Sequence, residues 1–261
     1  MATNVQIEID GRGVATVTLN RPTKHNAISA EMIAELAETA DALGGNNAVR
    51  VVVLTGAGAS FCAGGDLRWM QAQITADNDT RRSEARKLAA MLDAWNTLPK
   101  PVIGRLNGNT FGGGFGMACV CDVAIGVTGS KFGLTETKLG LIPATIGPYV
   151  VARMGEAMAR RVFMSSRVFN GDEAVTLGII VEAVDADALN AAVEVEIAPY
   201  LLCAPGAVAA AKVMARDLGP SITSDQIEAT IDALVARWGD PEVEQGLSAF
   251  FAKVPPPWAM K

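Results

Sequence analysis

Histidine is almost missing from this sequence: His25 is the only one among 261 residues. A Ser-His-Asp triad or a histidine-based zinc site is therefore not expected. Cysteine is also rare, and four residues in a chain of this length do not suggest a disulfide framework. They are Cys62, Cys119, Cys121 and Cys203. We expect a metal-free protein, with Cys119 and Cys121 acting as small hydrophobic residues.

Long apolar runs and basic clusters are missing as well. No stretch of about 18 apolar residues occurs, so no membrane span is predicted. Residues 1–10 are polar and lack the apolar centre of a signal peptide. Basic residues form only short pairs, at 81–82 and 160–161, and the net charge is -6. We therefore expect a cytoplasmic protein that binds neither membrane nor nucleic acid.

The chain is rich in hydrophobic residues. Hydrophobic residues make up 50% of the sequence and charged residues 19%. A chain of this length can form one large domain or two small ones with a well-buried core. The composition shifts near residue 200, after which every signal is helical. We predict a core over residues 1–200 and a helical region over 201–261 that acts as a lid or an oligomerisation element.

The order of elements can be read from periodicity and turn residues. Alternating segments at 5–9 and 14–19 predict a hairpin, and a buried strand is predicted at 51–55. Ser29 is the predicted N-cap of a helix that ends near residue 43. Residues 67–98 are predicted to be helical, with an interruption at 76–80. Further helices are predicted at 155–164, 187–202, 206–218, 224–238 and 241–252.

Two strand–glycine–helix junctions organise the middle of the chain, at 61–66 and at 111–116. Glycines carry no side chain that could cap the helix that follows them. The first N–H groups of that helix are therefore unpaired and can bind a negatively charged group. The two junctions together predict an oxyanion hole with one main-chain donor from each. Ordinary tight turns are the alternative interpretation.

Five blocks of the sequence resemble the enoyl-CoA hydratase/isomerase (crotonase) superfamily in residues, order and spacing. They are 19–27, 51–66, 111–122, 136–143 and 170–178. The resemblance implies an α/β fold, a spiral of repeated ββα turns followed by an all-helical C-terminal region. It also implies a homotrimer or a dimer of trimers. The substrate would be an acyl-CoA thioester, with coenzyme A as part of the substrate and no separate cofactor.

The same resemblance assigns the binding residues. Gly65 and Gly113 match the two positions whose amides hold the thioester oxygen. The backbone near Ala27, Ala63 and Gly65 matches the segments that grip the adenine and pantetheine of coenzyme A. Trp69 lies beside the first glycine turn and is assigned to binding, with core packing as the alternative.

Two assignments at the C-terminus rest on a looser match. Phe250 and Lys253 resemble the contacts to the nucleotide end of coenzyme A. We expect the helical region to contribute these residues to the substrate site.

The acid–base residues depart from the family pattern. Its hydratases usually carry two glutamates, one just after the glycines and one about twenty residues later. Here the first position is Gly116 and the second is Glu136. Two carboxylates explain water activation and protonation most simply, whereas one suits a 1,3-proton shuttle. Glu136 is the predicted catalytic residue, and Asp66 is a predicted helix cap. If the space beside Gly116 is empty, a glutamate there should raise hydration of crotonyl-CoA.

Residues 66–70 and 132–150 resemble the bacterial methylglutaconyl-CoA and isohexenylglutaconyl-CoA hydratases. This similarity predicts a hydro-lyase of fatty acid or branched-chain amino acid catabolism, acting on a branched or dicarboxylic 2-enoyl-CoA. Arg68, Arg105 and Arg153 are the candidates for contacting a substrate carboxylate. The alternatives are a Δ3-Δ2 enoyl-CoA isomerase that uses Glu136 alone and a non-catalytic acyl-CoA-binding protein.

Overall fold

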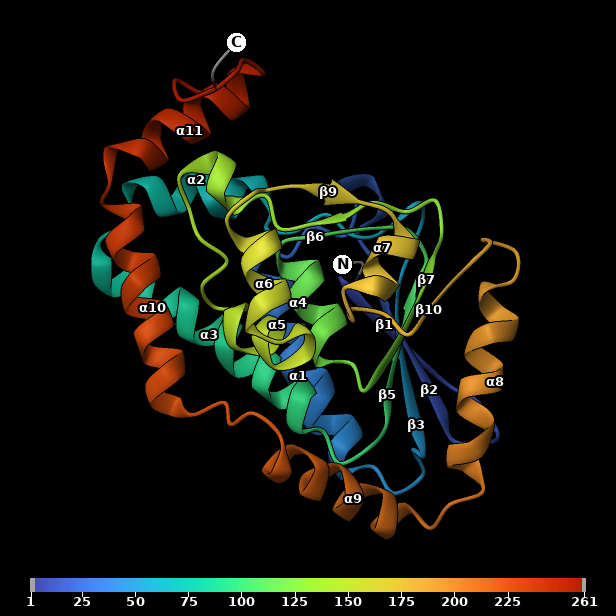
Figure 1. Ribbon diagram of the computed structural model, residues 1–261. Coiled ribbons are helices and arrows are strands. Elements are labelled where there is room, and N and C mark those ends of the chain that lie inside the picture. Colours follow the sequence, from blue (N-terminus) through green and yellow to red (C-terminus); the bar gives the residue numbers. More distant parts are fainter. Residues whose placement is uncertain (1–2, 260–261) are drawn as a thin grey trace.

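Two β-sheets organise the chain (Figure 1). The computed structural model describes residues 3–259. It contains a six-stranded sheet in the order β1-β2-β3-β5-β7-β10 and a four-stranded sheet in the order β4-β6-β8-β9. The strands are β1 Val5–Ile9, β2 Val14–Leu19, β3 Val51–Gly56, β4 Ser60–Cys62, β5 Val102–Leu106, β6 Asn109–Phe111, β7 Val123–Val127, β8 Phe132–Gly133, β9 Val168–Phe169 and β10 Glu182–Val184.

The sheets arise from a repeated step. Strands β3, β5 and β7 belong to the larger sheet, and each is followed directly by a strand of the smaller one. A helical segment then returns the chain to the larger sheet, whose strands are parallel apart from the β1–β2 hairpin. This succession is the predicted spiral of ββα turns, and the fold class is confirmed.

The helices begin where the sequence supplies a cap. Ser29 accepts a hydrogen bond from Met32 N, and Thr223 forms a capping box with Gln226. The helices that were predicted all form, with ends shifted by up to three residues, whereas α5 was not predicted. The described residues contain eleven α-helices. They are α1 Ala30–Gly45, α2 Leu67–Thr75, α3 Asn78–Thr97, α4 Gly113–Val120, α5 Gly147–Met154, α6 Glu156–Phe163, α7 Gly171–Thr176, α8 Leu189–Leu201, α9 Pro205–Leu218, α10 Ser224–Trp238 and α11 Pro241–Ala252, with the 3-10 turns η1 Pro22–Lys24 and η2 Glu136–Leu139.

Strand β3 shows where the core lies. Val52 and Leu54 face the main apolar core with α1, α3 and α4, while Val51 and Val53 face a second cluster under α8. Side chains alternate along a strand, so a sheet covered on both faces needs an unbroken apolar run. The continuous run at 51–54 thus reflects a strand buried on both sides.

The smaller sheet was not predicted. Its strands are two or three residues long, and no alternating pattern can be recognised over so short a length. They are defined by pairing with one another, chiefly parallel, and this pairing is a tertiary property. The sheet places the two glycine junctions beside each other.

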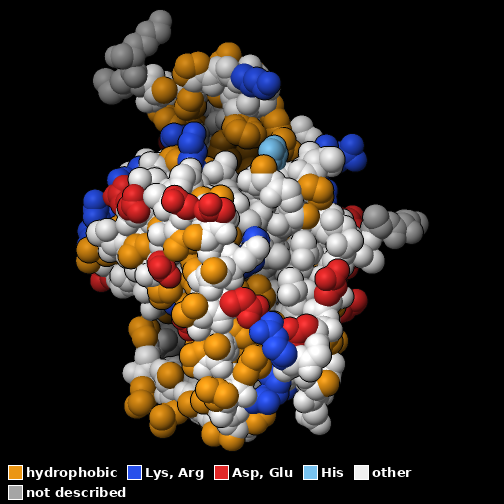
Figure 2. Space-filling view, turned by 90° about the vertical axis from the view of Figure 1, so that its right-hand side faces the viewer, with side chains coloured by type: hydrophobic (Ala, Val, Ile, Leu, Met, Phe, Trp, Pro, Cys, Tyr) orange, Lys and Arg blue, Asp and Glu red, His pale blue; other side chains and the backbone are white. Residues whose placement is uncertain are grey.

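The C-terminal helices run around the body of the molecule. In Figure 1, α8 covers one face of the larger sheet, α9 crosses below it, and α10 and α11 return along the opposite side. Helix α9 has no buried residue, and apolar side chains gather on the lower part of the surface in Figure 2. Within residues 3–259 no single helix has the length and hydropathy of a membrane span; α8 and α9 reach them only together, bent by 106°. The division at residue 200 stays a prediction.

Candidate active site

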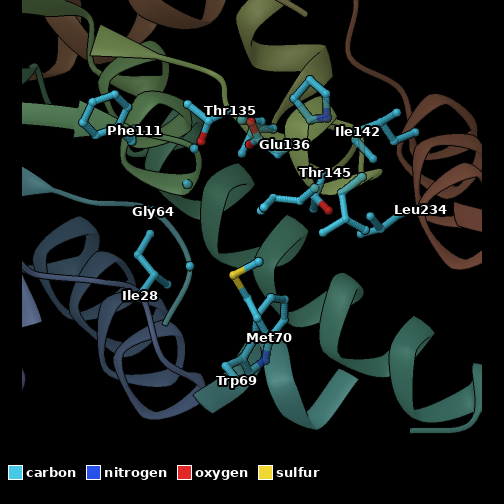
Figure 3. A pocket seen from close by; sticks show the side chains of 18 of the residues that line it. Ile28, Gly64, Trp69, Met70, Phe111, Thr135, Glu136, Ile142, Thr145 and Leu234 are labelled. Atoms are coloured by element: carbon cyan, nitrogen blue, oxygen red, sulfur yellow. The ribbon is translucent and has the colours of Figure 1, made fainter. Parts of the chain in front are cut away.

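A cavity of about 390 Å³ lies between the two glycine junctions, η2 and the C-terminal helices. Its walls are mostly apolar, as the side chains around Glu136 in Figure 3 show. Among the described residues, the charged ones on the walls are Glu136 and Lys138. The described residues on its walls come from every part of the chain. They are Ile28, Ile33, Ala63, Gly64, Gly65, Leu67, Trp69, Met70, Leu88, Phe111, Gly112, Gly113, Thr135, Glu136, Lys138, Leu139, Leu141, Ile142, Pro143, Ala144, Thr145, Ile146, Leu234, Trp238 and Phe250.

Glu136 is an ionisable residue on the wall of this cavity. Its Oε2 atom is buried and has no hydrogen-bond partner among the described residues. Burial raises the pKa of the Glu136 carboxyl to about 7, although the backbone N–H groups of Glu136 and Thr135 oppose the rise. A carboxyl with this pKa exchanges protons readily near neutral pH, which is the property required of a general acid–base.

The turn that carries Glu136 is held from the side of α11. Gly140 ends η2 with a φ of 75°, and its N–H donates to the Glu136 carbonyl. A Cβ at Gly140 would lie 2.8 Å from the backbone of Glu242, so only glycine allows α11 to approach this closely. Arg237 Nε donates to the Gly140 carbonyl at 2.8 Å. Helices α10 and α11 of the same chain therefore fix the position of Glu136.

A second support comes from the loop before β9. Ser166 is buried and has a φ of 46°, which is unusual for a residue other than glycine. Its hydroxyl accepts from the N–H of Lys138 at 3.2 Å and is hydrogen-bonded to the hydroxyl of Thr137. The η2 turn is thus anchored on two sides.

The two predicted main-chain donors line the same cavity as Glu136. Gly65 forms a parallel bridge with Ile28, but that bridge uses the neighbouring Gly64 carbonyl and Asp66 N–H. No hydrogen bond joins the N–H of Gly65 or Gly113 to another residue in 3–259. Helix α4 begins at Gly113, so this N–H lies in the first turn, where no helical acceptor exists. The structure brings together Gly65, Gly113 and Glu136.

The position opposite Gly116 is not empty. A Cβ on Gly116 would lie 2.4 Å from Ile146 Cγ2, 2.9 Å from Ile146 Cβ and 3.8 Å from Leu92 Cδ2. The prediction for a glutamate at position 116 depended on an empty space beside Gly116, and this condition is not met in the wild-type surroundings. The space is occupied by Ile146, which is almost fully buried and lines the cavity.

The remaining predicted binding residues fall into two groups. Ala63, Trp69 and Phe250 line the cavity, and the indole N–H of Trp69 donates to Glu84. Ala27 and Lys253 do not line it. The Ala27 carbonyl accepts from Arg21, and Lys253 ends α11 with a φ of 56°.

None of the three candidate arginines reaches the cavity. Arg105 donates to Asn190 and Thr55, and Arg153 donates to backbone carbonyls at the end of α4. Arg68 is exposed on α2. The described part of the chain therefore places no arginine on the walls of this cavity.

Several wall residues were not predicted from the sequence, among them Met70, Ile146, Leu234 and Trp238. They are ordinary apolar residues whose role depends on which face of a helix or loop they occupy. No sequence signal separates them from core residues, because both are apolar at helical spacing.

The enoyl-CoA hydratase/isomerase family model matches residues 10–261. The structure is similar to that of an enoyl-CoA hydratase from Shewanella pealeana, with a TM-score of 0.80, 34% identity and coverage of 98% of this chain and 96% of that one. The 1,2-epoxyphenylacetyl-CoA isomerase of Escherichia coli is 32% identical over 96% of each chain.

Closeness to the methylglutaconyl-CoA hydratase branch is not established by these similarities. The mitochondrial methylglutaconyl-CoA hydratase of Rattus norvegicus is 31% identical over 67% of this chain and 55% of its own length. That identity is no higher than the identity to the isomerase from Escherichia coli. The family itself is shown: the chain belongs to the enoyl-CoA hydratase/isomerase family of enzymes.

Proposed function

We propose that the chain adds water to a 2-enoyl-CoA whose acyl group is branched and apolar, with Glu136 as its only acid–base residue. The observation that carries this proposal is the Glu136 carboxyl, buried without a partner for Oε2 in the cavity that Gly65 and Gly113 also line. In this proposal the two glycine N–H groups hold the thioester oxygen.

The proton can be transferred by one carboxyl throughout. The Glu136 carboxylate accepts a proton from water as the water oxygen bonds to the β-carbon of the substrate. Electrons of the double bond move toward the α-carbon and the thioester oxygen, where the N–H groups of Gly65 and Gly113 stabilise them. The protonated Glu136 then delivers this proton to the α-carbon. The carboxylate is restored, and the second hydrogen of the water remains on the product hydroxyl.

The walls of the cavity favour a branched apolar acyl group over a dicarboxylic one. A buried substrate carboxylate needs a partnered cation, because the desolvation of an unpaired charge is costly. Among residues 3–259, Lys138 is the only cationic one on the walls, and it is exposed. Comparing kcat/KM for 3-methylcrotonyl-CoA and 3-methylglutaconyl-CoA tests this choice. A preference for the dicarboxylic substrate would reject the apolar assignment.

A second candidate function is isomerisation of a 3-enoyl-CoA to a 2-enoyl-CoA. The observation that favours it is Ile146, which fills the space where a second acid–base group would stand. A single carboxylate can remove a proton from the α-carbon and return it to the γ-carbon.

A panel of acyl-CoA substrates distinguishes these activities. Hydration appears as loss of the enoyl absorbance, and isomerisation appears as a gain of conjugation. A protein that binds coenzyme A thioesters but catalyses neither reaction would support the non-catalytic alternative. We expect loss of absorbance with branched 2-enoyl-CoA substrates, and its absence across the panel would refute the proposed hydratase.

The assembly and the nucleotide contacts are also proposals. The exposed apolar side chains of the last helical region, with Leu202 89% and Leu218 82% exposed, support a homotrimer or a dimer of trimers. Light scattering at micromolar concentration should give the mass of a trimer or hexamer, and a monomer would contradict it. Ala27, Phe250 and Lys253 are proposed to contact coenzyme A.

A further inference from the structure

Helix α4 carries glycines on the face near the site. Gly112 is its N-cap, Gly113 is its first residue, and Gly116 follows one turn later. Residues three apart share one face of a helix, so Gly116 lies on the same face as Gly113, which lines the cavity. A side chain at position 116 would therefore extend from the face that borders the cavity.

Ile146 is the residue that stands in front of Gly116. Its Cγ2 and Cβ atoms occupy the space into which a side chain at position 116 would grow. Ile146 lines the cavity and Gly116 does not, so the isoleucine separates the glycine from the substrate. Leu92 of α3 closes the space from another side.

The loop that carries Ile146 is restrained. Pro148 lies in the first turn of α5, and Ile146 itself is the N-cap of that helix. The N–H of Gly147 donates to the Ala144 carbonyl at 2.9 Å, and the N–H of Val150 donates to the Ile146 carbonyl at 3.1 Å. The Cβ atom of Ile146 therefore cannot move away without displacing the start of α5.

We propose that Ile146 is the specificity-determining residue of this site: it fills the position of a side chain at 116, confines the acid–base chemistry to Glu136, and limits the bulk of the acyl group. This inference rests on the proposed turnover of enoyl-CoA. It predicts that a larger side chain at position 116 is tolerated only when the side chain at position 146 is smaller.

A thermal double-mutant cycle tests the exchange without reference to activity. Gly116→Ala alone should lower the melting temperature, because its Cβ meets two atoms of Ile146. Combined with Ile146→Gly, the same change should cost much less than the sum of the single effects. Ile146→Val is the matched control, since valine keeps both contacting atoms and should not relieve Gly116→Ala. Additive effects of Gly116→Ala and Ile146→Gly on the melting temperature would overturn the inference.

Selectivity provides the second arm. The probes are crotonyl-CoA and a homologue that carries an isopropyl group at carbon 3. Ile146→Gly should raise the ratio of kcat/KM for the bulky probe over crotonyl-CoA by at least about tenfold, the lower end for a change of this size in an apolar pocket. Ile146→Val should change the ratio much less. An unchanged ratio in a folded Ile146→Gly variant would contradict the proposal.

The third experiment asks whether the space freed by Ile146→Gly can hold a second carboxylate. The double variant Gly116→Glu with Ile146→Gly should hydrate crotonyl-CoA at least about tenfold faster than the matched Gly116→Gln with Ile146→Gly, which has the same volume without the charge. Its pH–rate profile should gain a second titrating group.

The wild-type protein is assayed first. A wild-type protein that turns over no enoyl-CoA refutes the proposed function. If the wild type is active and the Glu and Gln double variants have equal rates, the proposed role of Ile146 is refuted and the proposed function is not.

Discussion

Two helices begin beside the cavity, α2 and α4, and their first turns differ in what the N–H groups bind. Both follow a glycine-rich junction. At α2 the protein supplies its own anion, the carboxylate of Asp66. At α4 the N-cap is Gly112, which has no side chain to offer. The comparison shows one local motif whose first-turn N–H groups are capped by the protein at α2, whereas at α4 the N-cap offers no side chain.

At α2 the carboxylate is fully engaged. Asp66 accepts from the N–H of Arg68 at 2.9 Å and from the N–H of Trp69 at 3.4 Å, and it forms an ion pair with Arg21 at 2.8 Å. Burial alone would raise the pKa of Asp66, but the hydrogen bonds from Arg21 and the two N–H groups lower it below its ordinary value. Asp66 therefore stays ionised and acts as a structural cap.

At α4 the situation is reversed. The Gly113 N–H has no acceptor among the described residues, and the carboxyl of Glu136 lies close to Gly112 without a cationic partner. Burial raises the pKa of Glu136 to about 7. Donors and acceptors left free in a dry cavity cost stability, so their retention fits a substrate that would pair with them.

The largest effect should come from removing the proton-transfer group beside α4. Glu136→Gln should lower kcat by at least about 10²-fold, the lower end for a positioned acid–base residue. Binding of a non-reactive coenzyme A thioester should change little, because the amide is nearly isosteric and the N–H donors remain. Steady-state kinetics and calorimetry measure the two quantities. Near-normal turnover would make Asp66 the next carboxylate to test.

The next effect concerns the free donor of α4. Gly113→Pro deletes this N–H at the first helical position, where proline is tolerated. Turnover should fall by about 10²- to 10³-fold, corresponding to about 2.7–4 kcal/mol. Gly113→Ala is the matched control, because it adds a Cβ against Ile28 and keeps the N–H. Equal losses in both variants would attribute the effect to volume and not to the donor.

The raised pKa of Glu136 predicts a dependence of stability on pH. The folded state binds the proton more tightly than the unfolded state, whose ordinary pKa is 4.5. The carboxyl therefore contributes stability below pH 4.5 that is lost as the pH rises through about 7. Above that pH, Glu136→Gln should be more stable than wild type by roughly 3 kcal/mol. The gain should disappear near pH 4 in denaturant titrations, and a gain independent of pH would contradict this explanation.

The smallest effect is expected at α2. Asp66→Asn keeps a capping oxygen but loses the ion pair with Arg21, so stability should fall by about 1–2 kcal/mol while turnover stays close to wild type. Because the pKa of Asp66 is lowered in the folded state, this stabilisation is present above its ordinary value of 3.8 and is lost as the pH falls below it. The difference between wild type and variant should shrink in that range. A large loss of turnover would instead give Asp66 a role in the reaction.

Much of the local structure could be predicted because it depends on neighbouring residues. Ser29 and Asp66 cap the helices that they were predicted to cap, since a capping oxygen reaches only two or three residues along the chain. The glycine junctions could be recognised for the same reason. The family motifs added the fold class and the choice of Glu136 as the candidate acid–base residue.

The sequence by itself thus determined the caps, most of the helices and the glycine junctions, and it made Glu136 the candidate acid–base residue. The tertiary structure decided what surrounds them. It set Ile146 against Gly116, kept Arg105 and Arg153 away from the cavity, and brought Leu234 of α10 to its wall. The physical reason is that apolar packing is non-directional: any apolar residue can fill such a position, and only the folded backbone determines which one does.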